Sequence, residues 1–278
     1  MHEPSTPSAA PRDVPPAATS AYVFDNAAAP TRLRFAGLPL VFDPGTIRHL
    51  EERGVSPGWR CLEVGAGGGS IARWLAERVG PAGFVLATDI DTRFLDGLRL
   101  PNLEVRRHDI GTEPLPVDTF DLVHCRLVLE HVPQREAALA WMAAALKPGG
   151  WLVAEEFGPY PWPPGLDLEP VVPLRALELL VEVALASGLV RYGPSLPARM
   201  QALYLSDIGA EGRIFRWTGG SPGAWVIRAG IQQLREAILA TGRISEDEVA
   251  ADLARLDDPA FAFASPLLWA VWGRRPPA

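Results

Sequence analysis

The fold of this chain is decided by residues 60–79, which read RCLEVGAGGGSIARWLAERV. An apolar run ends in Gly65, and after further glycines apolar residues recur at helical spacing, at Ile71, Trp74, Leu75 and Val79. This pattern predicts a strand over 60–64, a glycine turn and a helix over about 70–78. At such a turn in an open α/β sheet, bare glycine backbone lets a nucleoside-bearing ligand approach closely, and the N–H groups of the helix face it. The stretch therefore predicts a ligand site.

The strand and helix pattern repeats as far as about residue 157. We expect helices near 92–98 and 134–146, and apolar strands at 84–88, 103–107, 120–125 and 151–155. Alternation of this kind indicates right-handed crossovers and a parallel sheet that is covered by helices on both faces.

The flanking segments have a different composition. Residues 1–20 contain five prolines and no Ile, Leu, Phe, Trp or Tyr, so we expect a disordered tail. The stretch 21–55 is typical of helix with breaks at Pro39 and Pro44, which predicts a short helical cap and a second helix over about 44–53. Beyond a proline-rich connector at 158–173, the patterns predict helices at 174–187, 197–206, 222–241 and 245–256, a strand at 212–218, and an edge strand or hairpin partner within 261–273.

These segments predict one domain over 21–278 behind the tail. We expect a helical cap (21–55), a cofactor-binding core (56–157), a substrate or lid region (158–260) and a final strand (261–278). The apolar cap and the late helices are additions to a complete sheet. A homodimer formed through them is therefore an open alternative.

Composition excludes several classes of function. The net charge of −7, from 26 Lys and Arg against 33 Asp and Glu, supplies no positive surface for a phosphate backbone, so no nucleic acid is expected. Two cysteines are too few for a disulfide framework, which indicates a reducing, cytoplasmic setting. No apolar run approaches ~18 residues, and no signal peptide or membrane partner is expected. The five histidines are not grouped, so we expect no metal.

Three carboxylates follow three successive predicted strands. Glu63 precedes the glycine turn, and Asp89 and Asp109 end the next two strands. Each alone could be a helix cap or a solvated acid. Together they suit a nucleoside ligand that carries positive charge, because Glu63 would repel a pyrophosphate. Ser70 also stands where a dinucleotide-binding motif has Gly or Ala, which disfavours an NAD(P)-dependent oxidoreductase.

Five motifs in order carry a family resemblance: LEVGAGGG (62–69), ATDID (87–91), HDI (108–110), FDLV (120–123) and LKPGG (146–150). As a set they closely resemble the class I S-adenosylmethionine-dependent methyltransferases, most of all the small-molecule branch of quinone and natural-product biosynthesis. The resemblance covers about residues 40–157. It implies an α/β fold, a doubly wound, Rossmann-like, seven-stranded, mostly parallel sheet with an antiparallel last strand, plus a helical cap or lid. It also implies S-adenosylmethionine as the cofactor.

The resemblance implies cofactor contacts from Glu63, Gly65, Gly67, Asp89, Ile90, Asp109, Ile110, Cys125 and Arg126. By position, Glu63 and Gly65 would lie near the methionine ammonium. Asp89 would hold the ribose hydroxyls, with Asp91 as an alternative, and Asp109 would receive the adenine amine.

Methyl transfer from a sulfonium needs mainly a nucleophile held at about 3–3.5 Å and a site that excludes water, so a base is optional. Glu130, His131, Glu155 and Glu156 follow the fourth and fifth strands, and each could instead have a structural role. We name His131, Glu155 and Tyr22 as the catalytic candidates. Spare aromatic residues outside the sheet favour a small aromatic or polycyclic secondary metabolite, such as an indole, phenol or quinone, methylated at O, N or C. A non-catalytic partner protein with this fold is the other alternative.

Overall fold

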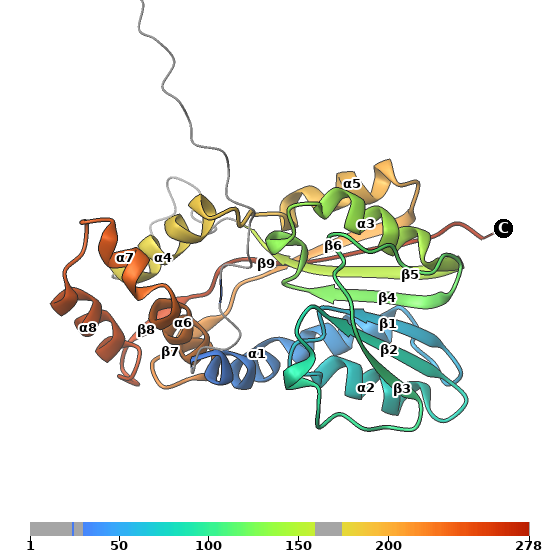
Figure 1. The fold of residues 1–278 in the computed structure, drawn as a ribbon, viewed down its shortest axis with the longest axis horizontal. Helices are drawn as coiled ribbons and strands as arrows, with labels where there is room; N and C mark the ends of the chain where they lie inside the picture. Colours follow the sequence, from blue (N-terminus) through green and yellow to red (C-terminus); the bar gives the residue numbers. More distant parts are fainter. Residues whose placement is uncertain (1–23, 25–29, 159–173, 278) are drawn as a thin grey trace, which may run out of the picture.

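The computed structural model describes residue 24 and residues 30–158 and 174–277 (Figure 1). The predicted tail at 1–20 and almost all of the proline-rich connector lie outside the described residues. A central sheet of seven strands has the order β3-β2-β1-β4-β5-β9-β6. Its strands are β1 (Arg60–Val64), β2 (Phe84–Asp89), β3 (Leu103–Arg107), β4 (Phe120–Arg126), β5 (Leu146–Phe157), β6 (Ser206–Arg213) and β9 (Leu268–Arg274).

The first five strands are parallel, and β9 runs antiparallel to both of its neighbours, β5 and β6. The predicted seven-stranded, mostly parallel sheet is therefore confirmed. The placement of its antiparallel strand at an edge is wrong, because β6 lies outside it. Pro266 has no backbone N–H to donate, which favours an edge position for any strand that contains it. The strand begins after it, at Leu268, and can therefore pair on both sides.

Helices cover both faces of the sheet, because side chains alternate along each strand. On one face, Leu62, Val123 and Leu152 pack in a core with α3 (Arg135–Ala144) and α5 (Leu196–Ala202). On the other face, Cys61 and Leu122 pack against α2 (Ser70–Val79) and the end of α1 (Pro30–Glu52).

The remaining helices form a lobe beside the carboxyl ends of the strands, on the left of Figure 1. The lobe has its own apolar core and a separate two-stranded antiparallel sheet. One strand of this sheet comes from the end of the predicted strand 212–218, and the other from the predicted final strand. The elements of the lobe are α4 (Arg175–Ala186), α6 (Pro222–Gln233), α7 (Arg235–Ala240), α8 (Glu246–Arg255), β7 (Arg216–Thr218) and β8 (Ala262–Ala264). No helix among the described residues is long and apolar enough to cross a membrane.

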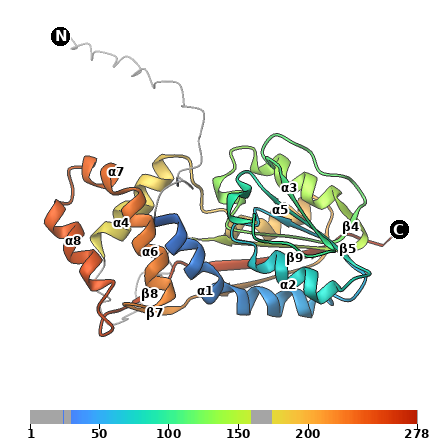
Figure 2. The same cartoon turned by 60° about the horizontal axis from the view of Figure 1, so that its bottom comes forward.

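Some predicted helices differ in the structure. The helix expected over 92–98 is only a 3₁₀ turn, η1 (Thr92–Phe94). The breaks expected at Pro39 and Pro44 are absent, because α1 is a single helix that contains both prolines. At 1.5 Å per residue, α1 is about 35 Å long, and it reaches from the helical lobe to α2 beneath the sheet (Figure 2). Tertiary contacts at both ends outweigh the local cost of the prolines.

The contact between α1 and α6 requires a glycine. A Cβ atom on Gly37 would lie 2.7 Å from the carbonyl oxygen of Pro222 and 2.9 Å from Cγ2 of Val226. Near the start of α1 and at the end of α6, the side chain of Gln233 donates a hydrogen bond to Thr31 at 2.6 Å. The two helices therefore pack backbone to backbone at Gly37.

We predict that Gly37→Val lowers the free energy of unfolding by about 1–3 kcal/mol, because α1 must move away from α6. Gly97→Val is the matched control, since a Cβ atom on Gly97 would meet nothing within 4 Å. Urea denaturation followed by circular dichroism measures both variants. Equal effects of the two substitutions would contradict the close packing at Gly37.

Candidate functional site

A cavity of about 730 Å³ lies where the carboxyl ends of the strands meet the helical lobe. One end is lined by the glycine turn and by residues that follow β2, β3 and β4. The other end is lined by apolar side chains of α4 and α6, together with Phe24 and Phe157, and α1 contributes Phe35 and Leu38 to the lining. The order of the sheet reverses between β1 and β4, and such switch points open a crevice outside the strand ends.

The glycine turn forms one wall of this cavity. Gly65 and Gly67 both have positive φ angles, of 67° and 53°. A Cβ atom on Gly65 would lie 2.3 Å from Cγ2 of Val128, and one on Gly67 would lie 3.3 Å from the ring of Phe35. Both glycines line the cavity, and a side chain on Gly65 would clash with Val128, which lines it too.

The two carboxylates after β2 have different surroundings. Asp89 lines the cavity, and its oxygens accept hydrogen bonds from the backbone of Gly67 at 2.8 Å and of Asp91 at 2.9 Å. Burial raises the pKa of Asp89, and these hydrogen bonds oppose the rise. Asp91 instead caps η1 and forms an ion pair with Arg93 at 2.6 Å. Of the two, Asp89 is the residue that faces the cavity.

Residues that follow β2 and β3 complete this end. Asp109 accepts a hydrogen bond from the backbone of Gly111 at 2.9 Å, and it lines the cavity together with Ile90 and Ile110. Ile90 is 49% exposed, which is unusual for so large an apolar side chain. An open aliphatic face beside a carboxylate suits a flat ring that carries an amine.

Glu63 lies at the cavity wall beneath the glycine turn and is only 4% exposed. Its Oε2 lies 2.6 Å from Nδ1 of His124, which sits opposite it on β4. Burial raises the pKa of Glu63, and His124 opposes the rise. Burial alone would lower the pKa of His124, but Glu63 and Glu155 raise it to about 9. The sequence predicted Glu63 at the site, whereas the charge of the buried His124 was not foreseen.

Glu155, named as a catalytic candidate from the sequence, does not line the cavity. It is fully buried on the face of the sheet that α1 covers, where it accepts hydrogen bonds from the hydroxyl of Thr46 and, at 3.1 Å, from Arg213. Burial alone would raise the pKa of Glu155, but His124 and the neighbouring donors lower it to about 2.

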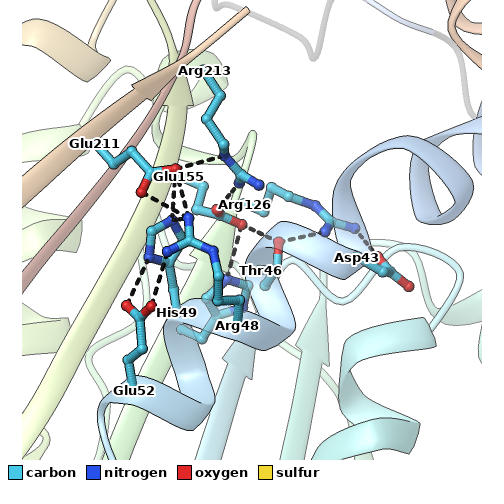
Figure 3. A network of polar contacts seen from close by, with 10 residues as sticks. Asp43, Thr46, Arg48, His49, Glu52, Arg126, Glu155, Glu211 and Arg213 are labelled. Atoms are coloured by element: carbon cyan, nitrogen blue, oxygen red, sulfur yellow. Dashed lines mark hydrogen bonds and ion pairs between the residues drawn. The ribbon is translucent and has the colours of Figure 1, made fainter. Parts of the chain in front are cut away.

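Arg126, at the end of β4, belongs to the network of polar contacts around Thr46 and Glu155 (Figure 3). It lines the cavity and donates hydrogen bonds to Thr46 and Asp43, both at 2.8 Å. Cys125, one residue earlier, was expected to contribute backbone groups; it does not line the cavity, and its side chain is fully buried in the core on the opposite face. Alternation along β4 turns these two neighbours to opposite sides.

Glu130 and His131, in the 3₁₀ turn η2 (Leu129–His131), line the middle of the cavity. The ring of His131 lies edge to face on Phe24 at 5.9 Å, and its Nε2 lies 3.4 Å from Glu130. Burial and the positive charge of Arg34 lower the pKa of His131 to about 3. His131 thus lines the cavity, and a pKa of about 3 makes it neutral at pH 7.

Glu156 does not line the cavity. Its carboxylate accepts hydrogen bonds from the backbone N–H groups of Val128, Leu129 and Glu130 at 2.8–3.2 Å. Burial and the negative charge of Glu156 raise the pKa of Glu130 well above its ordinary value. The backbone donors favour charge on Glu156, so the proton of this pair belongs on Glu130.

The third catalytic candidate, Tyr22, lies outside the described residues. Two residues of α1, Arg34 and Phe35, line the cavity, and neither was predicted at the site from the sequence. Their signal was weak: one charged residue and one aromatic residue within an otherwise ordinary helical pattern. Among the described residues, no group of three His, Cys, Asp or Glu side chains is placed to hold a metal ion.

Comparison with known proteins agrees with this geometry. Residues 62–154 match the family described as a methyltransferase domain. The ubiquinone/menaquinone biosynthesis C-methyltransferase UbiE of Laribacter hongkongensis is 35% identical over 140 residues, which are 47% of this chain and 54% of that protein. The chain spans about half the length of the curated relatives it matches.

Solved structures show the same fold at lower identity. Phosphoethanolamine N-methyltransferase 2 of Haemonchus contortus, solved with phosphomonomethylethanolamine and S-adenosylhomocysteine, has a TM-score of 0.57 at 17% identity and covers 88% of this chain and 57% of its own. The YcgJ protein of Bacillus subtilis has a TM-score of 0.57 at 16% identity and covers 85% of this chain and 100% of its own. The sheet order, the glycine turn and the family match agree: residues 62–154 match a methyltransferase domain, and the chain has the fold of these solved structures.

Proposed function

We propose that this protein transfers a methyl group from S-adenosylmethionine to an O, N or C atom of a small aromatic or polycyclic secondary metabolite. The observation that carries the proposal is the single cavity. It joins a glycine turn with three strand-end carboxylates to a compartment with apolar walls.

The first end of the cavity has the chemistry that an adenosyl sulfonium needs. The oxygens of Asp89 suit the two ribose hydroxyls, and Asp109 suits the adenine amine with Ile90 and Ile110 against the ring. Glu63 offers negative charge to the ammonium of the methionine part. When bound, the cofactor supplies the electrophilic methyl group. The same carboxylates would repel the pyrophosphate of a dinucleotide.

The second end favours an acceptor with large apolar surface. Its walls include Leu177, Leu180, Val181, Val226 and Ile227. Its polar side chains are few, with Arg34, Glu130 and His131 close to the strand ends. A ring system with one polar group directed at these residues fits this division. The similarity of half the chain to quinone C-methyltransferases supports the same class of acceptor.

His131 is suited to orienting the acceptor. Its neutral ring can accept a hydrogen bond from a hydroxyl of the acceptor, but a pKa of about 3 makes it a weak base. Because the displacement at a sulfonium needs chiefly alignment of the nucleophile, an orienting contact is sufficient.

The cofactor assignment is tested by calorimetry with S-adenosylhomocysteine. Asp89→Asn should weaken binding by about 10- to 100-fold, because it removes charge-assisted hydrogen bonds. Asp91→Asn, two residues away, should change the affinity by less than about twofold, because Asp91 does not line the cavity. Tighter binding of NADH than of S-adenosylhomocysteine, or equal effects of both substitutions, would exclude the assignment.

The acceptor compartment is tested with a panel of indoles, phenols and quinones and labelled cofactor. Val181→Trp should raise the KM for the best acceptor at least about tenfold by filling the apolar end, and leave affinity for S-adenosylhomocysteine within about twofold. Leu40→Trp is the control, because Leu40 is 62% exposed and does not line this cavity. Absence of methyl transfer to every acceptor tested would favour a non-catalytic partner protein. Loss of affinity for S-adenosylhomocysteine in Val181→Trp would show that the acceptor compartment is not at Val181.

The neutral state of His131 predicts a pH dependence of stability. The pKa falls from 6.5 in the unfolded chain to about 3 in the fold, so the fold loses stability as the pH drops below 6.5. This group alone should reduce the free energy of unfolding by about 2 kcal/mol between pH 7 and pH 5. In urea denaturation at pH 7 and pH 5, the decrease in the free energy of unfolding should be about 2 kcal/mol smaller for His131→Asn than for the wild type. Identical decreases in the two proteins would show that His131 titrates normally.

A further inference from the structure

A row of three buried ionisable side chains crosses the sheet beneath the glycine turn. His124 on β4 lies between Glu63 on β1, at 2.6 Å, and Glu155 on β5, at 3.7 Å. Apolar side chains would fill this space at lower cost, because each buried charge loses its hydration. Of the three residues, only Glu63 lines the cavity. Any effect of this row on a ligand in the cavity must therefore act through Glu63.

The surroundings of His124 hold it in the charged form. Glu63 and Glu155 face it from the two neighbouring strands, and Glu155 is in turn fixed by Thr46 of α1 and by Arg213 of β6. The other charged or titratable groups near this row are Asp43, Arg48 and His49 of α1, Arg126 of β4 and Glu211 of β6. Two carboxylates on opposite sides of one imidazole favour the imidazolium.

The imidazolium has a direct effect on Glu63. A carboxyl that is 4% exposed tends to take up a proton, and His124 opposes this. The hydrogen bond to His124 occupies Oε2, and among the described residues Oε1 accepts no hydrogen bond. His124 thus keeps a negative oxygen available at the wall of the cavity.

We propose that His124 is a positioning residue of the cofactor site, which holds the ionised carboxylate of Glu63 toward the ammonium group of the cofactor's methionine part. This inference rests on the proposed function and adds to it a residue that does not itself line the cavity. Glu155 supports the same arrangement, because it pairs with the far side of the imidazolium and is tied to α1.

The role of His124 predicts an effect on one part of the cofactor only. S-adenosylhomocysteine carries the ammonium group. 5′-Methylthioadenosine has the same adenosine and a thioether, but it lacks the amino-acid part. Loss of the charge on His124 should weaken binding of the first ligand and spare the second. General damage to the fold would weaken both.

Calorimetry with His124→Gln provides the test. Glutamine can still donate a hydrogen bond to Glu63 but carries no charge. At pH 7.5 we expect affinity for S-adenosylhomocysteine to fall about tenfold or more, with 5′-methylthioadenosine within about twofold of the wild type. His49→Gln is the matched control, because His49 is also fully buried but contacts Glu52 and Glu211 rather than Glu63. It should leave both ligands within about twofold.

The pH profile gives an independent readout. In His124→Gln, affinity for S-adenosylhomocysteine should fall further between pH 8 and pH 6, because Glu63 has lost its counter-charge and takes up a proton there. The wild type should stay flat over this range. Equal losses for both ligands, or unchanged affinity for both, would overturn the inference.

A second variant keeps the test decisive if His124→Gln does not fold. Glu63→Gln should give the same selective loss, and combining the two substitutions should add little to either one. Equal weakening of both ligands by Glu63→Gln would overturn the inference. A wild-type protein that binds neither ligand would instead overturn the proposed function, and this inference with it.

Discussion

The hydroxyl of Thr46 is the contact on which the site depends. It accepts a hydrogen bond from Arg126 of β4 and donates one to Glu155 of β5, and thereby fixes α1 to the middle of the sheet. An isolated charge buried at this depth would cost several kcal/mol, so these partners must stay together. Because α1 is one continuous helix, this anchor also sets the position of Arg34 and Phe35 at the cavity.

The two ends of the cavity differ in polarity because one is built by strand ends and the other by helices. Parallel strands end at one edge of the sheet, where the turns that follow them place carboxylates and glycine backbone together. The helical lobe contributes mainly apolar faces, since its helices must bury a stripe against each other. A charged cofactor and an apolar acceptor can therefore meet at the boundary of the two, near Glu130 and His131.

The regular part of the fold was predictable from the sequence because its signals are local. The apolar runs of β1 to β4 and the glycine turn occupy adjacent residues, and their spacing alone indicates strand, turn and helix. The same holds for Asp89 and Asp109, which lie at the ends of predicted strands. The helical lobe was harder to predict. Residues 212–218 read as one strand, but they belong to two different sheets, and only pairing with strands far away in the chain divides them.

Pro39 and Pro44 show the limit of local reasoning, because both normally end a helix, yet contacts with α6 and the sheet keep α1 whole. Glu155 and Glu156 show it again, since alternation places them on opposite faces but does not show that neither side chain lines the cavity.

The sequence by itself determined the sheet core, the glycine turn and the acidic residues at the strand ends. Only the tertiary structure decided that His124 is charged and that Glu155 anchors a helix, because those properties depend on partners that are far away in the chain. Thr46 and Glu155 are 109 residues apart. No pattern within one segment contains that contact, and the protonation of a buried group follows from its contacts.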